Sequence, residues 1–241
     1  MIVQPLIFGS TERGAVKGYQ LLARYAGIDD QAAQEFCRWA PSHQSLQSSS
    51  VDAESLSFFP VSEDMFAVAR SIYGGPEYSG RGGLQVVTLA LIISRHQFVN
   101  YDNDPFQVLT TAKALGHLLL PATTPQNLKT ISLPRRPVAV PAEPLSDEHR
   151  LLARDTAKKL VDGRRVVVVG KCNPTTISQH VFETIRSTDR TKISVSTGLK
   201  LSSRREFQLQ FVTSADPASR AQWSRQQITC LTAADHAVLT A

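Results

Sequence analysis

The sequence predicts an α+β or α/β fold, with mixed sheets and flanking helices divided between two subdomains. Apolar runs such as Leu84–Ile93 and Val166–Val169 are typical of strands buried on both faces. Pairs such as Asp104-Pro105 are typical of helix starts. Six of the 13 prolines lie between Pro121 and Pro144, and because proline fixes φ and lacks an N–H, we expect an extended connector there. The predicted division is residues 1–120, 121–145 and 146–241.

In the N-terminal half we expect four strands and three helical segments. The strands, of which the last two form a hairpin with a glycine-rich loop, are Ile2–Phe8, Leu56–Val61, Met65–Tyr73 and Leu84–Asn100. The helical segments are a turn at Gly18–Tyr25, a helix capped by Asp29 or Asp30 that stops at Pro41, and a helix after Asp104 whose apolar stripe runs from Phe106 to Leu119.

In the C-terminal half, helices and strands alternate more regularly. The helices start at Ser146, Asn173-Pro174 and Asp216-Pro217, and the strands are Val166–Val169, Ile193–Leu199 and Phe207–Val212. Glutamine alternates with apolar residues at Gln208 and Gln210, so we expect that strand to have one wet face or to lie at a sheet edge.

The composition indicates an ordinary folded chain. Its 241 residues are 42% hydrophobic and 20% charged, which excludes a wholly disordered protein. The longest apolar run, near Val86–Ile93, is far shorter than the roughly 20 residues that span a bilayer, and no signal-peptide pattern is visible. Cys37, Cys172 and Cys230 are too few and too widely spaced for a disulfide framework or a zinc site. We therefore expect a cytoplasmic protein with no membrane association.

The net charge of +5 is unevenly distributed. Residues 1–120 hold 8 basic and 11 acidic residues, a net of −3, whereas residues 121–241 hold 18 and 10, a net of +8. A basic half is typical of proteins that bind an anionic partner, such as a nucleic acid, a nucleotide phosphate or an acidic protein face. The same charges are expected of a solvated surface that maintains solubility, and we favour this interpretation because they are scattered and form no recognised nucleic-acid motif.

Two glycine features resemble phosphate-binding loops but lack the groups that bind phosphate and Mg²⁺. Gly75–Gly82 has Walker A spacing but no Lys followed by Ser or Thr, and it precedes a strand instead of a helix. Gly170 and Lys171 follow a strand, but Arg165 and Cys172 occupy the positions of the first glycine and the metal-binding hydroxyl. We expect a nucleoside triphosphate site at neither.

No local motif predicts catalysis, a metal or a cofactor. The six histidines show no two-ligand spacing, and no G-x-S-x-G sequence occurs. A hydrolase built from residues distant in sequence, for example His96 with Asp102 or Asp104, remains an alternative.

The most distinctive stretch is Ser194–Phe207, in which hydroxyl and apolar residues alternate before a glycine and a basic pair. One interpretation is an anion or partner site, because guanidinium groups bind phosphate and carboxylate in a bidentate manner. Its candidate residues, together with Arg81 of the glycine-rich loop, are Ser196, Thr197, Lys200, Arg204 and Arg205. The other interpretation is a strand with hydroxyls satisfied by neighbouring backbone, followed by arginines that are solvated or paired to Asp189 and Glu183.

Ser194–Phe207 also resembles the S-F-S-T-G-L-(K/R)-x-S-x-R-R-x-F signature of the N-terminal domain of bacterial GTPase-associated proteins. Gly18–Gly27 resembles that family's G-x-x-L-L-x-x-S-x-G, Tyr78–Gly83 its glycine-arginine loop and Arg164–Val169 its basic-then-aliphatic strand. Two departures are Tyr25, which replaces a small residue, and Thr88, which stands where the family's histidine is expected.

The resemblance implies an adaptor or regulatory module encoded beside a GTPase in bacterial defence systems, with no catalytic residues to transfer. The leading prediction is therefore a non-enzymatic interaction module with a protein partner from a GTPase system. One alternative is a module that binds nucleic acid or a nucleotide through the basic C-terminal half, and another is the hydrolase described above.

Overall fold

Both halves of the chain contribute to one mixed β-sheet. The computed structural model describes residues 1–11, 18–76, 83–125, 127–137 and 143–233. In these residues ten strands form a sheet of order β10-β7-β9-β8-β3-β4-β5-β1-β2, with β6 paired to β1 outside that path. The strands are β1 (Ile2–Thr11), β2 (Gly18–Arg24), β3 (Glu54–Pro60), β4 (Met65–Pro76), β5 (Leu84–Ser94), β6 (Ile131–Ser132), β7 (Arg165–Val169), β8 (Val195–Ser196), β9 (Leu209–Val212) and β10 (Ile228–Thr232). The fold class predicted from the sequence is confirmed.

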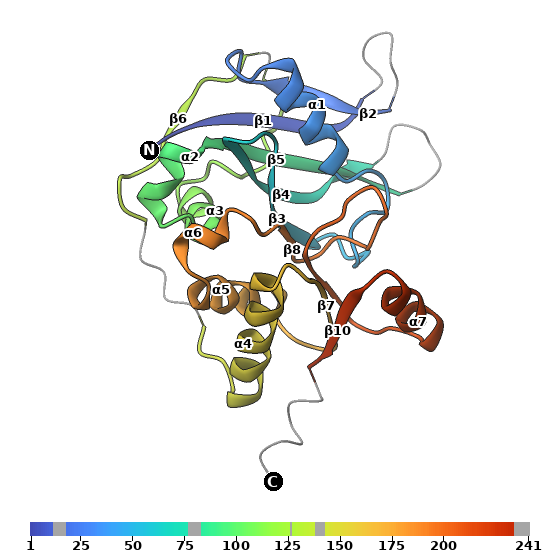
Figure 1. Ribbon diagram of the computed structural model, residues 1–241. Helices are drawn as coiled ribbons and strands as arrows, with labels where there is room; N and C mark the ends of the chain where they lie inside the picture. The colour runs from blue at the N-terminus through green and yellow to red at the C-terminus, as the bar shows by residue number, and fades with distance from the viewer. Residues whose placement is uncertain (12–17, 77–82, 126, 138–142, 234–241) are drawn as a thin grey trace.

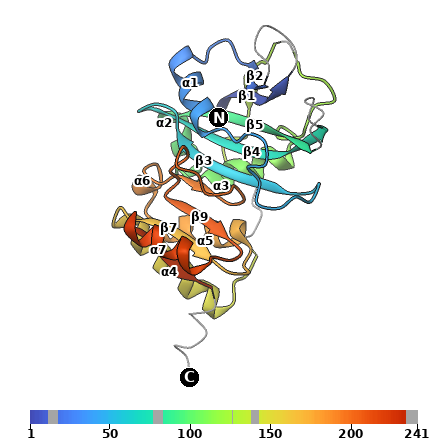
Figure 2. The same cartoon turned by 90° about the vertical axis from the view of Figure 1, so that its right-hand side faces the viewer.

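The two halves join at the short strand β8. It pairs antiparallel with β3 at Ser57 and Phe58, and parallel with β9. Strands β1 to β6 pair antiparallel with one another, whereas β7 pairs parallel with both β9 and β10. Figure 2 shows the N-terminal strands above the C-terminal strands, with β3 nearest the junction. The division at residues 1–120, 121–145 and 146–241 stays a prediction, although strands on both sides of the connector share this sheet.

Helices cover both faces of the sheet. They are α1 (Asp30–Trp39), α2 (Arg95–Phe98), α3 (Pro105–Ala114), α4 (Asp147–Val161), α5 (Pro174–Thr184), α6 (Ser187–Arg190) and α7 (Pro217–Arg225), with a 3₁₀ turn at Val99–Tyr101. None of the helices in the described part of the chain has the length and apolar character that a membrane crossing requires.

The largest core spans the junction on one face of the sheet. It joins side chains of α3 from the N-terminal half with those of α4 and α5 from the C-terminal half. At its centre the Phe58 ring lies 5.5 Å from the Phe98 ring and 6.2 Å from the Phe182 ring, measured between centroids. The opposite face is covered by α1 over the N-terminal strands and by α7 over β7 and β10. Figure 1 shows α4 and α5 on one side of β7 and β10 and α7 on the other.

The helix starts predicted from the sequence are confirmed by side-chain caps. At each start a side-chain oxygen accepts hydrogen bonds from backbone N–H groups of the first turn, which have no partner within the helix. The capping residues are Asp29, Asp104, Ser146, Asn173 and Asp216.

Three N-terminal predictions are wrong. Gly18–Arg24 is strand β2, not a helical turn, because β1 offers it an antiparallel ladder in which Leu21 pairs with Phe8. The strand predicted at Leu84–Asn100 ends at Ser94, since Arg95–Phe98 form α2. The apolar stripe after Asp104 is also shorter than predicted, because α3 ends at Ala114 and leaves Leu119 63% exposed.

Two C-terminal predictions also need correction. Strand β9 has neither a wet face nor an edge position, because it lies between β7 and β8 and its Gln210 is 1% exposed. The strand predicted at Ile193–Leu199 is regular only at Val195–Ser196. A further strand, β10, was not predicted and pairs with β7 at the edge of the sheet.

Candidate functional site

Two loops from opposite halves of the chain meet beside α1. The Lys200 N–H donates to the Ser45 carbonyl at 2.8 Å, and the Gln47 N–H donates to the Gly198 carbonyl at 2.9 Å. Leu46 and Leu199 form an isolated β-bridge between the same loops. Figure 1 shows the orange segment after β8 lying next to the blue loop that follows α1. Residues about 150 positions apart are therefore held together by backbone hydrogen bonds.

These loops, α1 and the start of β2 border an open cavity of about 770 Å³. This volume is within the range of small-molecule binding sites. Four basic residues line it, and the described lining contains no aspartate or glutamate. The basic residues, which define what we call the basic pocket, are Arg38, Lys200, Arg204 and Arg205.

Arg205 is the buried member of the basic pocket. Arg205 is only 8% exposed, and its Nη2 lies 3.4 Å from the Ser45 Oγ. Its Nε is buried with no hydrogen-bond partner among the described residues. Burial, followed by the neighbouring charge of Arg204, lowers the pKa of the Arg205 guanidinium. Because buried arginines are ordinarily paired, this side chain has unused capacity to bind an anion.

The other basic side chains differ in their surroundings. Lys200 and Arg204 are exposed, and within the described residues neither forms an ion pair. Arg38 pairs with Glu35 at 2.9 Å, but both side chains are accessible to solvent. The positive charge of the pocket is therefore only partly compensated.

A strained backbone position borders the same cavity. Gln44, which lines the basic pocket, has a φ of 57°. Residues other than glycine rarely adopt this left-handed backbone conformation. Where it occurs, it often marks a functional site. Here it turns the chain back so that Ser45 reaches both Lys200 and Arg205.

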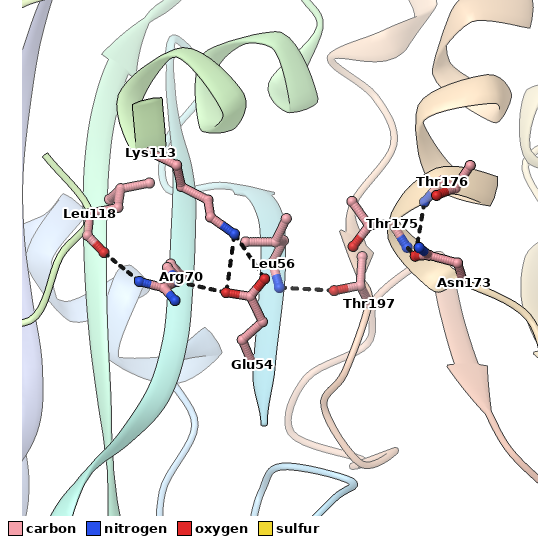
Figure 3. Close-up of polar contacts among 9 residues, drawn as sticks. All are labelled: Glu54, Leu56, Arg70, Lys113, Leu118, Asn173, Thr175, Thr176 and Thr197. Carbon is pink, nitrogen blue, oxygen red and sulfur yellow. Dashed lines mark hydrogen bonds and ion pairs between the residues drawn. The ribbon is translucent and has the colours of Figure 1, made fainter. Parts of the chain in front are cut away.

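The predicted hydroxyl ligands do not reach this pocket. The Ser196 Oγ lies 3.1 Å from the Ser55 Oγ. The Thr197 Oγ1 accepts a hydrogen bond from the Leu56 N–H at 2.9 Å (Figure 3). Both residues are buried against β3, which is the arrangement expected if the hydroxyls are satisfied locally. Gly198 permits this close approach, because a Cβ there would overlap the Glu54 carbonyl oxygen.

The structure therefore divides the six candidate site residues into three groups. Lys200, Arg204 and Arg205 come together, Ser196 and Thr197 face β3, and Arg81 lies outside the described residues. The alternative pairing with Asp189 is not formed, since that carboxylate contacts Arg186 at 3.0 Å and Lys192 at 2.8 Å. Glu183 pairs with His180.

Sequence reasoning missed the residues that α1 and its following loop contribute. Gln34 and Arg38 lie four positions apart on α1, so they share the helix face that borders the pocket. That spacing was visible in the sequence, but the meeting of α1 with residues 200–205 was not.

A second charged cluster joins α3 to the sheet (Figure 3). The Glu54 carboxylate accepts from Arg70 Nε at 2.7 Å and from Lys113 Nζ at 2.9 Å. Burial alone would raise the pKa of Glu54, but the hydrogen bonds and charges of Lys113 and Arg70 hold it below its usual value. Arg70 also donates to the Leu118 carbonyl at 2.9 Å. Because the Glu54 carboxylate is bound by both Arg70 and Lys113, this cluster has a structural role in fixing the end of α3.

Among the described residues, no hydrogen bond or ion pair joins His96 to Asp102 or Asp104. The His96 ring contacts Ser94 at 2.9 Å and Gln97 at 3.1 Å. Asp104 instead caps α3 by accepting from the Phe106 N–H at 2.8 Å. In the part of the chain that the structure describes, no three His, Cys, Asp or Glu side chains are grouped in a way that could hold a metal.

The chain matches a known protein family over its N-terminal half. The family model described as GTPase-associated protein 1, N-terminal domain type 2, matches residues 2–134. The match includes Gly18–Gly27 and Tyr78–Gly83, but Arg164–Val169 and Ser194–Phe207 lie beyond its end. No curated protein matches the chain.

Proposed function

The chain belongs to the family of GTPase-associated protein 1 N-terminal domains of type 2, and from this premise we propose that it is a non-enzymatic interaction module for a GTPase-system protein. The family match carries the proposal, because it spans more than half of the chain. We place the module in the bacterial cytoplasm, as an adaptor or regulatory part of a defence system encoded beside a GTPase.

An exposed apolar segment supports a protein partner. Leu115, Leu119 and Leu120 follow α3 and are 46%, 63% and 42% exposed. Apolar side chains gathered on a surface favour association, since contact with a partner removes them from water. The segment lies within the family match.

This segment is anchored to the rest of the fold. Leu118 is 1% exposed within the main core, and its carbonyl accepts the hydrogen bond from Arg70. The exposed leucines are therefore presented from a fixed support, which lowers the entropic cost of binding. We propose that they contact the GTPase-system partner.

The test is co-expression of the tagged chain with the GTPase encoded beside it, followed by affinity purification and size-exclusion chromatography. We expect a stoichiometric complex that the double variant Leu115→Ser, Leu119→Ser weakens at least tenfold. Val161→Ser is the matched control, because Val161 is 52% exposed on α4 outside the family match. Absence of a complex with the wild-type chain would contradict the interaction, and equal weakening by both variants would contradict its proposed location.

A further inference from the structure

We propose that the basic pocket binds a small molecule that carries a phosphate group. This inference goes beyond the proposed function and does not depend on it, since the described lining of the pocket comes from this one chain. It rests on the charge of the lining, the burial of Arg205, and the size and chemistry of the cavity.

The lining is electrostatically unbalanced. Arg38, Lys200, Arg204 and Arg205 border one cavity, and its described lining contains no carboxylate, although Glu35 outside the lining pairs with Arg38. Like charges that face one cavity repel one another and favour occupation by an anion. A phosphate group fits this environment because it can carry two negative charges and several acceptor oxygens.

Arg205 distinguishes this cavity from a merely basic surface. Arg205 is more than nine-tenths buried, its Nε lacks a partner among the described residues, and the one described hydrogen bond of its side chain is a long contact with Ser45. A buried guanidinium is normally compensated by an anion. An arginine fork is also well suited to phosphate, which it can bind through two parallel hydrogen bonds.

The remainder of the pocket indicates a ligand larger than phosphate alone. A cavity of about 770 Å³ exceeds the volume that one phosphate group needs. Its lining also includes the aromatic residues Phe8 and Tyr19, whose ring centroids are 6.1 Å apart. Gln34 and Gln44 add neutral hydrogen-bonding groups. A mononucleotide combines a phosphate with a ring that can pack on aromatic side chains, so it is the first probe to use.

A bound nucleic-acid strand is less compatible with the surroundings. Proteins that bind single-stranded nucleic acid hold the strand backbone along an extended basic groove. Here the surface beside the pocket carries acidic side chains of α1, including exposed Asp30 and partly exposed Glu35. Binding of an oligonucleotide is therefore treated as a competing outcome of the experiment.

The experiment is calorimetric titration of the full chain with ADP, GDP, pyrophosphate, adenosine and a single-stranded oligonucleotide. We expect at least one of ADP, GDP and pyrophosphate to bind with a Kd below 1 mM, whereas adenosine does not bind. ADP or GDP binding more tightly than pyrophosphate would support contacts to the nucleoside, and equal binding would support recognition of phosphate alone. Failure of all three to bind would overturn the proposal, as would tighter, length-dependent binding of the oligonucleotide.

The variants are chosen to separate the pocket from net charge. Lys200→Gln with Arg204→Gln removes two exposed cations from the lining, and we expect it to weaken binding at least tenfold. Lys158→Gln with Arg225→Gln removes the same charge from exposed positions on α4 and α7, and we expect less than a twofold effect. Equal weakening by both pairs would overturn the location of the site. Arg205→Gln adds a test of the buried group, with a thermal unfolding curve to establish that it folds.

Discussion

At the residue scale, neighbouring charges determine which side chains are committed to the fold. Glu54 holds two cations, Arg70 and Lys113, and so joins β3, β4 and α3. Arg205 is buried without a carboxylate partner among the described residues. The Glu54 cluster is therefore structural, whereas Arg205 retains the capacity to bind a ligand.

Replacing Glu54 with glutamine should destabilise the protein by about 1–2 kcal/mol at pH 7, since two partly buried cations lose their shared carboxylate. The folded-state pKa of Glu54 is lowered by its partners, so its stabilisation is present above the unfolded value of about 4.3 and is lost as pH falls through the folded value. In urea unfolding, the difference in stability between Glu54→Gln and the wild type should be smaller at pH 3 than at pH 7. Glu63→Gln, at an exposed position, is the control, and an undiminished difference at pH 3 would contradict the ionic explanation.

At the element scale, each long helix begins at a residue that caps it. Asp104 and Asp216 both cap helices that start with proline, but their environments differ. Burial raises the pKa of Asp104 despite the opposing charge of Arg190, whereas hydrogen bonds from Ser219 lower the pKa of Asp216. The carboxyl pKa of the same local motif is therefore shifted in opposite directions in the two helices, because the tertiary packing around each carboxyl group differs.

Replacing Asp104 with asparagine should leave stability at pH 7 unchanged or slightly raised, because the amide oxygen still accepts from Phe106 and no charge is buried. Asp104→Ala should cost about 1 kcal/mol, the usual value for a lost cap. With a folded-state pKa raised above about 3.9, the wild-type carboxyl favours folding at low pH, and that stability is lost as pH rises through the folded value. Denaturation curves from pH 4 to pH 8 should show this dependence in wild type and not in Asp104→Asn. Equal destabilisation by both variants at pH 7 would contradict it.

At the scale of the whole molecule, the shared sheet links the two halves. The family match ends at residue 134, but β3 completes its hydrogen bonding with β8, beyond that end. The main core crosses the same junction through Phe58 and Phe182. The matched region therefore depends on the second half for part of its packing.

A fragment of residues 1–145 should be less stable than the full chain and prone to aggregation. Without β8, strand β3 becomes an unpaired edge and the apolar face around Phe58 is exposed. We expect the full chain to unfold in urea as one transition, and the fragment to bind a hydrophobic dye and form oligomers on size-exclusion chromatography. Addition of residues 146–241 should reduce both effects. A monomeric fragment with the midpoint of the full chain would show that the halves are independent.

Local chemistry made much of the secondary structure predictable. The caps at Asp29, Asp104 and Asn173 act on N–H groups two or three residues away, so their signals are contained in short sequence windows. The buried strands at Leu84–Ile93 and Val166–Val169 were likewise predictable from their continuous apolar runs. Gly18–Arg24 and Gln210 were misjudged because their state depends on pairing with other strands, β1 for the first and β7 for the second.

The sequence by itself determined the positions of the capped helices and buried strands, the resemblance to GTPase-associated proteins, and the basic character of residues 200–205. Only the tertiary structure decided that Ser196 and Thr197 turn toward β3, and that Lys200, Arg204 and Arg205 meet Arg38. The physical reason is the distance along the chain over which each interaction acts. Capping and burial patterns act over a few residues, whereas the pocket forms through hydrogen bonds between Ser45 and residues about 155 positions later, which no local pattern encodes.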